Sequence, residues 1–292
     1  MEWNDLFETA VVVTDGAWGT QLQSMGLPPV ECPDAYNLTH PDAVRAVAER
    51  YIAAGSQIVL TNTFGASRKM LQRHHLSDHT VEINRIGADL SREAAASGCK
   101  VFGSIGPTGV LLMMGEASEE ELADVFAEQA AALVEGGVDG LVIETMSDLQ
   151  EACIATRAAV AAGVPVVACM CYDKGENLDR TMMGVTPEQA VKGLTDAGAH
   201  AIGANCGQGL DGYIKICRRL AAATDLPIWI KANAGLPEYE DGRSVYRTTP
   251  TEFAGKIPLL IEAGATFVGG CCGTTPEFIS KVSEVVRGLS NP

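Results

Sequence analysis

A recurring phrase constrains the fold of this chain more than any other feature of the sequence. Several Ala-rich segments end in Ala-Gly or Gly-Gly, and a short apolar run follows each of them within a few residues. A glycine at such a place can adopt the left-handed conformation that commonly ends a helix. The runs that follow are rich in Val and Ile, which is typical of strands buried in a parallel sheet. We therefore predict that helices end at Gly55, Gly137, Gly163, Gly198 and Gly264.

Eight apolar runs of this kind occur, and a helical pattern follows each one. The predicted strands are Ala10–Thr14, Gln57–Thr61, Lys100–Ile105, Asp139–Glu144, Pro165–Cys171, His200–Asn205, Pro227–Ala232 and Thr266–Gly270. Helix starts are predicted at Thr39-His40-Pro41, at Ser118 with Glu121 as a capping box, and at Thr186, Thr249 and Thr275, each followed by proline. Since one (β/α)8 barrel takes about 250 residues, we predict a single-domain TIM barrel over residues 1–292. An open doubly wound sheet is the alternative, but the units are even and show no break.

Charge and composition exclude some classes of function. The chain carries 21 basic and 37 acidic residues, and a surface this acidic repels nucleic-acid phosphates. No apolar run approaches the roughly 20 residues that span a bilayer, and the N-terminus lacks the basic start of a signal peptide. We expect no nucleic-acid or membrane partner and a cytoplasmic location. In a reducing compartment the nine cysteines are metal ligands, nucleophiles or small buried residues rather than a disulfide scaffold.

Polar residues and cysteines gather where the predicted strands end, which is the catalytic face of a TIM barrel. They are Asp15, Gly16, Thr61, Asn62, Thr63, Ser104, Glu144, Thr145, Met170, Cys171, Asn205, Cys206, Gly207, Lys231, Asn233 and the run Gly269–Gly273. The longer predicted loops also follow strands and belong to this face. These loops are Gln21–Asn37, Gly106–Ala117, Tyr172–Val185 and Gly235–Thr248.

Cys206, Cys271 and Cys272 form the most informative set at this face, because strands six and eight are near neighbours around a closed barrel. Side chains alternate along a strand, so two adjacent cysteines need a bent backbone to share one site, and the glycines of GGCCG permit it. Three thiolates and one open position match a catalytic zinc site, and thiolates favour zinc over magnesium or calcium. The alternative is that all three are small residues buried in a crowded turn.

Two acidic residues end predicted strands and have two interpretations each. Asp15 and Glu144 can bind an ammonium group through charge-assisted hydrogen bonds, or they can accept backbone N–H groups and fix a loop. The segment Gly103–Gly109 is an anion-binding nest or a rigid turn, and the turn is favoured. The remaining cysteines are interpreted as core or surface thiols, with Cys171 nearest the site. His74, His75 and His79 are expected on a solvated surface.

Seven motifs at these strand ends resemble the homocysteine S-methyltransferase family, which includes the homocysteine-binding module of cobalamin-dependent methionine synthase. They are DGAWGTQL (Asp15–Leu22), LTNTFGAS (Leu60–Ser67), GSIGPTG (Gly103–Gly109), IETMSDLQE (Ile143–Glu151), GANCGQG (Gly203–Gly209), KANAGLP (Lys231–Pro237) and GGCCGTTPE (Gly269–Glu277). They occur in the family's order over nearly the whole chain. The amino-acid sequences of the motifs GSIGPTG, ANAGLP and SDLQE are closest to those of the methionine synthase module.

The resemblance implies a zinc ion held by Cys206, Cys271 and Cys272, with the sulfur of homocysteine completing the site. It implies that Asp15, Gly16 and Glu144 hold the amino-acid end of homocysteine. Thr63 and Ser104 follow as neighbours of that pocket. Asn233 follows as a group that occupies the open zinc position when substrate is absent. The implied product is methionine.

The methyl donor is open at this stage. The motif wording favours a separate methyl-corrinoid protein that docks at the barrel mouth, although the chain holds no Asp-x-His-x-x-Gly cobalamin signature. The alternative is a stand-alone enzyme that uses S-methylmethionine, S-adenosylmethionine or betaine. Two further interpretations are a zinc-bound thiol sensor and an unrelated barrel aldolase, in which Lys231 forms a Schiff base.

Overall fold

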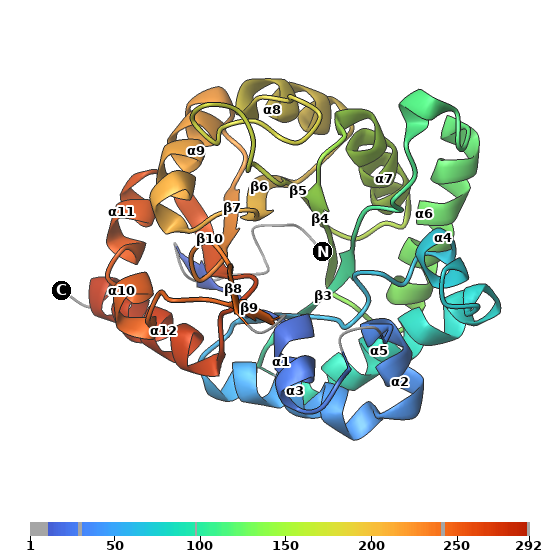
Figure 1. Ribbon diagram of the computed structural model, residues 1–292, viewed down its shortest axis with the longest axis horizontal. Helices are drawn as coiled ribbons and strands as arrows, with labels where there is room; N and C mark the ends of the chain where they lie inside the picture. The colour runs from blue at the N-terminus through green and yellow to red at the C-terminus, as the bar shows by residue number, and fades with distance from the viewer. Residues whose placement is uncertain (1–10, 29–30, 97, 241–242, 291–292) are drawn as a thin grey trace.

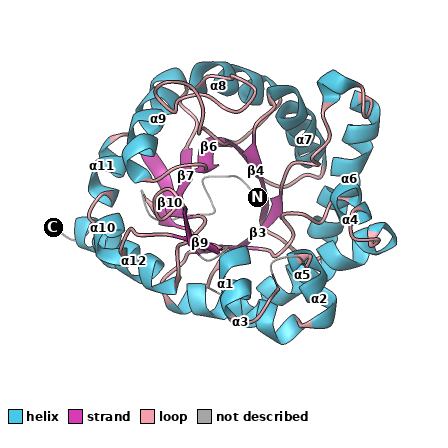
Figure 2. Cartoon of the chain, in the orientation of Figure 1, coloured by secondary structure: helices cyan, strands magenta, loops and turns pink. Residues whose placement is uncertain are grey.

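A ring of strands enclosed by a ring of helices forms the body of the molecule (Figure 1, Figure 2). The computed structural model describes residues 11–28, 31–96, 98–240 and 243–290. Eight parallel strands lie in the order β1-β10-β7-β6-β5-β4-β3-β2. They are β1 (Val12–Val13), β2 (Ile58–Leu60), β3 (Lys100–Ile105), β4 (Gly140–Met146), β5 (Val166–Met170), β6 (Ala201–Cys206), β7 (Ile228–Ala232) and β10 (Ala265–Gly270). The predicted (β/α)8 barrel is confirmed.

The barrel closes between its shortest strands. Thr14 and Ile58 form a single parallel bridge, and the Gln57 N–H donates to the Val13 carbonyl oxygen at 2.7 Å. The predicted start of the first strand, Ala10, lies outside the described residues. The other predicted strands overlap the observed ones, with ends that differ by about two residues at most. Such end differences are ordinary for elements whose last residues have few hydrogen bonds.

Helices cover the outside of the strands. They are α1 (Gly19–Ser24), α2 (Tyr36–Thr39), α3 (Pro41–Ala53), α4 (Arg68–Gln72), α5 (Thr80–Ala95), α6 (Glu119–Glu135), α7 (Leu149–Ala161), α8 (Pro187–Asp196), α9 (Leu210–Ala223), α10 (Pro250–Ala254), α11 (Ile257–Glu262) and α12 (Pro276–Ser290). The five glycines predicted to end helices have φ between +82° and +106°. This left-handed conformation turns the chain back toward the next strand.

The helix starts differ from the predicted capping chemistry at α3 and α6, and α3 begins at Pro41 after His40 with no side-chain cap. Thr186 and Thr249 form complete capping boxes with Gln189 and Glu252. Ser118 accepts a hydrogen bond from the Glu121 backbone N–H, which is the first half of a box. The Glu121 carboxylate pairs with Lys69 on α4. This ion pair with Lys69 therefore adds to the cap of α6.

Three of the predicted loops contain regular structure, including a 3-10 turn at Leu112–Met114 after β3. The segment after β7 forms a small antiparallel hairpin of β8 (Glu238–Glu240) and β9 (Arg243–Val245). The segment after β1 contains most of α1 and a 3-10 turn at Pro33–Ala35. All of these elements are too short to produce a detectable periodicity of apolar residues, so the sequence indicated only loops.

Aromatic rings fill the interior of the barrel beneath the strand ends. The ring centroid of Trp229 lies 6.1 Å from that of Phe102 and 5.1 Å from that of Phe267. These rings are buried with Ile58, Val142 and other inward-facing residues, so the interior is a packed core, as in other TIM barrels. Within the described ranges, no helix is both long and apolar enough to span a bilayer.

Candidate active site

A cavity of about 520 Å³ opens at the C-terminal ends of the strands. Side chains from widely separated strands reach its wall. They include Gly16, Trp18, Thr63, Ser104, Glu144, Thr145, Cys206, Lys231, Cys271 and Cys272. Seven of the nine residues predicted for the metal and substrate sites therefore surround one space. Asp15 and Asn233 are not among the residues that line it.

The thiols of Cys206, Cys271 and Cys272 form a cluster on this wall. Their Sγ atoms all lie within 4.8 Å of one another, and those of Cys206 and Cys272 are 3.9 Å apart. Among the described residues this is the one group of three His, Cys, Asp or Glu side chains placed to hold a metal ion. Cys171 and Cys32, of which Cys32 lines the cavity, are outside this group.

Strand register brings the three thiols together. Ala232 of β7 pairs with Cys206 on one side and with Gly270 on the other, so β6 and β10 end at the same level. The Cys271 N–H then donates to the Ala232 carbonyl oxygen at 2.7 Å. The chain turns sharply after both strands, with φ of +61° at Cys206 and +81° at Gly273. A Cβ at Gly273 would lie 2.2 Å from the Tyr246 ring, so the turn needs glycine.

Crowding affects the ionisation of the thiols. The neighbouring Cys206 thiol, together with burial, raises the pKa of Cys271. An ionised thiol beside a second one is unfavourable, because like charges repel in a medium of low dielectric constant. Three thiols this close ionise together only when a cation neutralises them. That is the behaviour expected of a metal-binding set.

Glu144 lies on the same wall at the end of β4, and its side chain is held in one orientation. Its Oε1 accepts a hydrogen bond from Ser104 Oγ at 2.5 Å, and its Oε2 accepts one from Asn205 Nδ2 at 3.2 Å. Burial raises the pKa of Glu144, while the Lys231 ammonium and the Ser104 hydroxyl oppose the increase. A carboxylate that is 7% exposed and faces a cavity is suited to bind a cationic group.

Asp15 is fully buried behind the wall and has several partners. One carboxylate oxygen pairs with the Lys231 ammonium. The other accepts hydrogen bonds from Trp18 Nε1 and from the Leu60 N–H, both at 2.8 Å. These contacts fix the loop after β1 against β2 and β7, as the loop-fixing interpretation of Asp15 requires.

Lys231 lines the cavity but is unsuited to Schiff-base chemistry. Burial lowers the pKa of Lys231, yet the carboxylates of Asp15 and Glu144 together raise it above the ordinary value. The amine is therefore protonated and is not a nucleophile. This disfavours the aldolase interpretation.

The remaining predicted residues occupy different places. Thr63 is buried on the wall and donates to the Ser104 carbonyl oxygen at 2.7 Å. Gly16 lies on the wall where a Cβ would be 2.7 Å from the Tyr51 hydroxyl, so only glycine fits. Asn233 is 4% exposed, and its Oδ1 has no hydrogen-bond partner among the described residues.

Several functional candidates were missed at the sequence level. Trp18 and Asp34 line the cavity, and Asp34 accepts a hydrogen bond from the Gly65 N–H at 2.9 Å. Trp18 follows the first strand within a Gly-rich motif, which is the signal that points to it. His74 is exposed as expected but lines the cavity. Nothing in the sequence places it there, because it follows α4, far from any strand end.

The segment Gly103–Gly109 is fixed from behind. The Thr108 N–H and hydroxyl both donate to Glu151 Oε1, at 2.8 Å and 2.6 Å. Glu151 belongs to α7 and is 4% exposed. These bonds support the rigid turn rather than an anion-binding nest.

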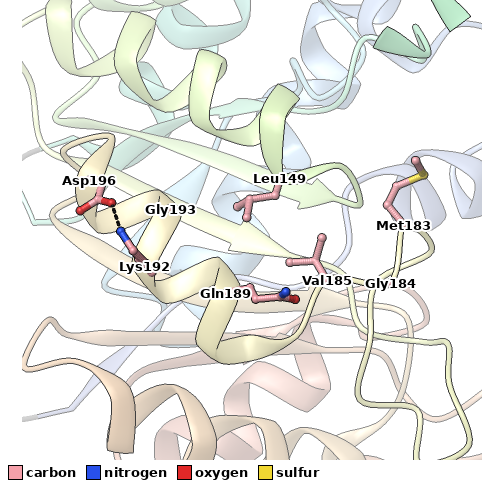
Figure 3. A pocket seen from close by; sticks show the side chains of 8 residues that line it. All are labelled: Leu149, Met183, Gly184, Val185, Gln189, Lys192, Gly193 and Asp196. Carbon is pink, nitrogen blue, oxygen red and sulfur yellow. Dashed lines mark hydrogen bonds and ion pairs between the residues drawn. The ribbon is translucent and has the colours of Figure 1, made fainter. Parts of the chain in front are cut away.

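A second hollow of about 410 Å³ lies between α7 and α8 (Figure 3). Leu149, Met183 and Val185 give it an apolar wall, and Lys192 pairs with Asp196 at 2.7 Å on its edge. It contains none of the predicted site residues. Seven of those residues line the cavity at the barrel mouth instead.

The fold and the site together define an enzyme of the (β/α)8-barrel class with a three-cysteine cluster in its active-site cavity. Comparison with known proteins narrows this class. A family model described as "Homocysteine S-methyltransferase" matches residues 12–286. The chain belongs to the homocysteine S-methyltransferase family.

Individual relatives agree with this assignment. The methionine synthase of Mycobacterium tuberculosis (strain ATCC 25618 / H37Rv) is 29% identical over 304 residues, covering 99% of this chain and 26% of the relative. The methionine synthase of Mycobacterium leprae (strain TN) is 30% identical over 301 residues, covering 97% and 25%. The chain thus spans about a quarter of the length of these curated relatives.

The fold also matches a solved structure over its full length. This is the homocysteine methyltransferase MmuM from Escherichia coli in its metallated form, with a TM-score of 0.81 and 22% identity. The match covers 97% of this chain and 98% of the other. At this identity the likeness shows the fold.

Proposed function

We propose that this enzyme transfers a methyl group to the thiol of homocysteine and forms methionine, using zinc held by Cys206, Cys271 and Cys272. The observation that carries the proposal is the position of the three thiols on the wall of a cavity that also presents the Glu144 carboxylate. Family membership and the names of the two mycobacterial relatives support it.

The geometry of the thiols fits a zinc ion. With Zn–S bonds of about 2.3 Å, tetrahedral coordination places two sulfurs about 3.8 Å apart. The Cys206 and Cys272 sulfurs are separated by 3.9 Å. When bound, zinc would supply the positive charge that ionises the homocysteine thiol at neutral pH. All nine cysteines are free, which agrees with action in the reducing cytoplasm.

The amino-acid end of homocysteine binds in the same cavity, beside the thiol cluster. Glu144 receives the ammonium group, and Ser104 keeps the carboxylate oriented from one side. Gly16 lets the substrate approach the backbone closely, and Asp15 holds this loop in place through Lys231. Thr63 holds the adjacent loop through its bond to Ser104. Asn233, with its unpartnered Oδ1, fills the open metal position before substrate arrives.

The chemical step is an in-line displacement. The ionised sulfur of homocysteine attacks the methyl carbon, and a carbon–sulfur bond forms as the bond between methyl and donor breaks. The electron pair of that bond stays with the donor, and the thiol proton has passed to solvent. The residues of this chain bind and orient the acceptor, so no general base is needed at this step.

The donor that we propose is a methyl-corrinoid protein that covers the barrel mouth. Large apolar side chains project from the loops that follow the strands. Met113 and Met114 are 73% and 69% exposed after β3, and Met182 and Leu236 are 63% and 60% exposed after β5 and β7. Exposed apolar side chains grouped on one face are typical of a protein-docking surface. The alternative is a small donor, which a cavity of about 520 Å³ is large enough to admit beside homocysteine.

A donor panel tests the proposal. Purified protein with zinc and homocysteine is supplied in turn with methylcobalamin, S-methylmethionine, S-adenosylmethionine and betaine, and methionine is measured by mass spectrometry. Methionine from methylcobalamin alone is expected. Turnover with a sulfonium or with betaine refutes the corrinoid donor, and no methionine from any donor, with no homocysteine binding, refutes the acceptor as well.

A further inference from the structure

The side chain of Asn205 connects the two halves of the site. Asn205 is the penultimate residue of β6 and is 0% exposed. Its Nδ2 donates to Glu144 Oε2 at 3.2 Å, and the Cys271 sulfur lies 4.0 Å from the same nitrogen. One amide nitrogen therefore contacts both the carboxylate proposed to bind the ammonium and a thiol of the cluster proposed to bind the metal.

The same side chain also fixes Thr145, which follows Glu144. Asn205 Oδ1 accepts from the Thr145 N–H, and Asn205 Nδ2 donates to Thr145 Oγ1, both at 2.7 Å. Thr145 has φ of +62°, an unfavourable conformation for a β-branched residue. It lies where the pairing of β4 with β5 shifts register, between Ile143 and Met146. The bonds from Asn205 hold this irregular turn, and the turn sets the direction of Glu144.

The Asn205 side chain has a rigid base. Its backbone pairs with Lys231 in the middle of the sheet, and its carbonyl oxygen accepts a hydrogen bond from the Tyr213 hydroxyl at 2.8 Å. Since the base is fixed, the separation between Glu144 and Cys271 follows from the length of one asparagine side chain. Ser104 holds the other Glu144 oxygen, so the carboxylate is held from both sides.

We propose that Asn205 is a positioning residue that makes the site selective for the length of the amino thiol. This inference rests on the proposed function. In it, Asn205 sets the distance between the Glu144 carboxylate, which binds the ammonium group, and the thiol cluster, which holds the sulfur end. Homocysteine has two methylene groups between its α-carbon and sulfur, and cysteine has one. When this separation is fixed, homocysteine is long enough to reach both the carboxylate and the thiol cluster, while cysteine reaches only one of them.

Binding measurements on zinc-loaded protein test this inference. The dissociation constants of homocysteine and cysteine are measured by titration calorimetry for the native chain, Asn205→Ala and Asn205→Asp. Asn205→Asp keeps an acceptor for the Thr145 N–H but loses the Nδ2 donor to Glu144 and to the Thr145 hydroxyl. We expect both variants to retain zinc, and the preference for homocysteine over cysteine to fall about 10- to 100-fold, the effect of one charge-assisted hydrogen bond.

Asp139→Ala is the matched control. Asp139 immediately precedes β4, at the end opposite to Glu144, and it accepts from the Val101 N–H and pairs with Arg92. Its loss lowers stability without reaching the cavity, so selectivity stays at the native value. If the Asn205 variants lose only stability, as the control does, Asn205 is merely structural and the inference is wrong. If the native chain binds no homocysteine, the proposed function fails first.

Discussion

The Sγ atoms of Cys206 and Cys272 lie 3.9 Å apart, although the two residues are 66 positions apart in the sequence. The close approach depends on Ala232 of β7, which pairs with both flanking strands at the same level. A metal site built this way is attached to the rigid end of the barrel. Metal loss should therefore inactivate the enzyme without unfolding it.

Replacing Cys206, Cys271 or Cys272 by Ala should reduce zinc from about one per chain to a trace and lower turnover by roughly 100-fold or more, because three ligands hold the ion. Zinc is measured by plasma mass spectrometry and folding by circular dichroism. Cys217→Ala is the control, because this buried thiol on α9 donates to the Leu260 and Ala263 carbonyl oxygens and does not line the cavity. Global unfolding of the three variants would instead indicate a structural metal site.

Replacing Glu144 by Gln should raise the KM for homocysteine about 10- to 100-fold, because a neutral amide binds an ammonium group less strongly than a carboxylate does. Zinc content should not change. Glu151→Gln makes the same charge change outside the cavity, where the carboxylate binds only Thr108. Equal losses of zinc and homocysteine binding in Glu144→Gln would contradict the assigned role.

Replacing Lys231 by Met should lower the free energy of unfolding by about 3–5 kcal/mol, because the buried Asp15 carboxylate loses its charged partner. The double variant Lys231→Met with Asp15→Asn should recover part of that stability, since Asp15 no longer carries an unpaired charge and only the interaction of Lys231 with Glu144 is lost. Urea denaturation of the two single variants and the double variant measures the coupling. Additive losses would show that the pair contributes nothing specific.

Replacing Asp34 by Asn should change how stability depends on pH. Burial raises the pKa of Asp34 to about 6, so the folded chain binds this proton more tightly than the unfolded chain does. The contribution of Asp34 to stability is thus full below about pH 4 and lost as the pH rises to about 6. A neutral amide at this position has no such loss. The free energy of unfolding of the variant, relative to that of the native chain, should therefore be higher at pH 7 than at pH 4. A stability difference that is the same at both pH values would refute the assignment.

Replacing both Met113 and Met114 by Glu should slow methyl transfer from a corrinoid protein by about 10-fold, because these exposed side chains belong to the proposed docking face. Transfer from free methylcobalamin should be unchanged, since the cavity itself is intact. Leu259→Glu is the control, an exposed apolar residue on α11 away from the barrel mouth. Equal slowing with both donors would mean that the substitution damages the site rather than the docking face.

The sequence by itself determined the barrel. Glycine-terminated helices alternate with short apolar strands, and this local pattern is enough to specify eight βα units and the face on which the functional residues lie. It also singled out the three cysteines, because thiols at strand ends stand out against apolar strand interiors. Local chemistry was sufficient in these cases, since each signal lies within one unit of the chain.

Only the tertiary structure decided which groups contact one another across units. The pairing of Asp15 with Lys231, which lie 216 positions apart in the sequence, depends on barrel closure. The contacts of Asn205 with Glu144 and Cys271 depend on three strands and on a positive φ at Thr145. Such contacts are set by strand register and backbone direction, and no periodicity within one segment encodes them.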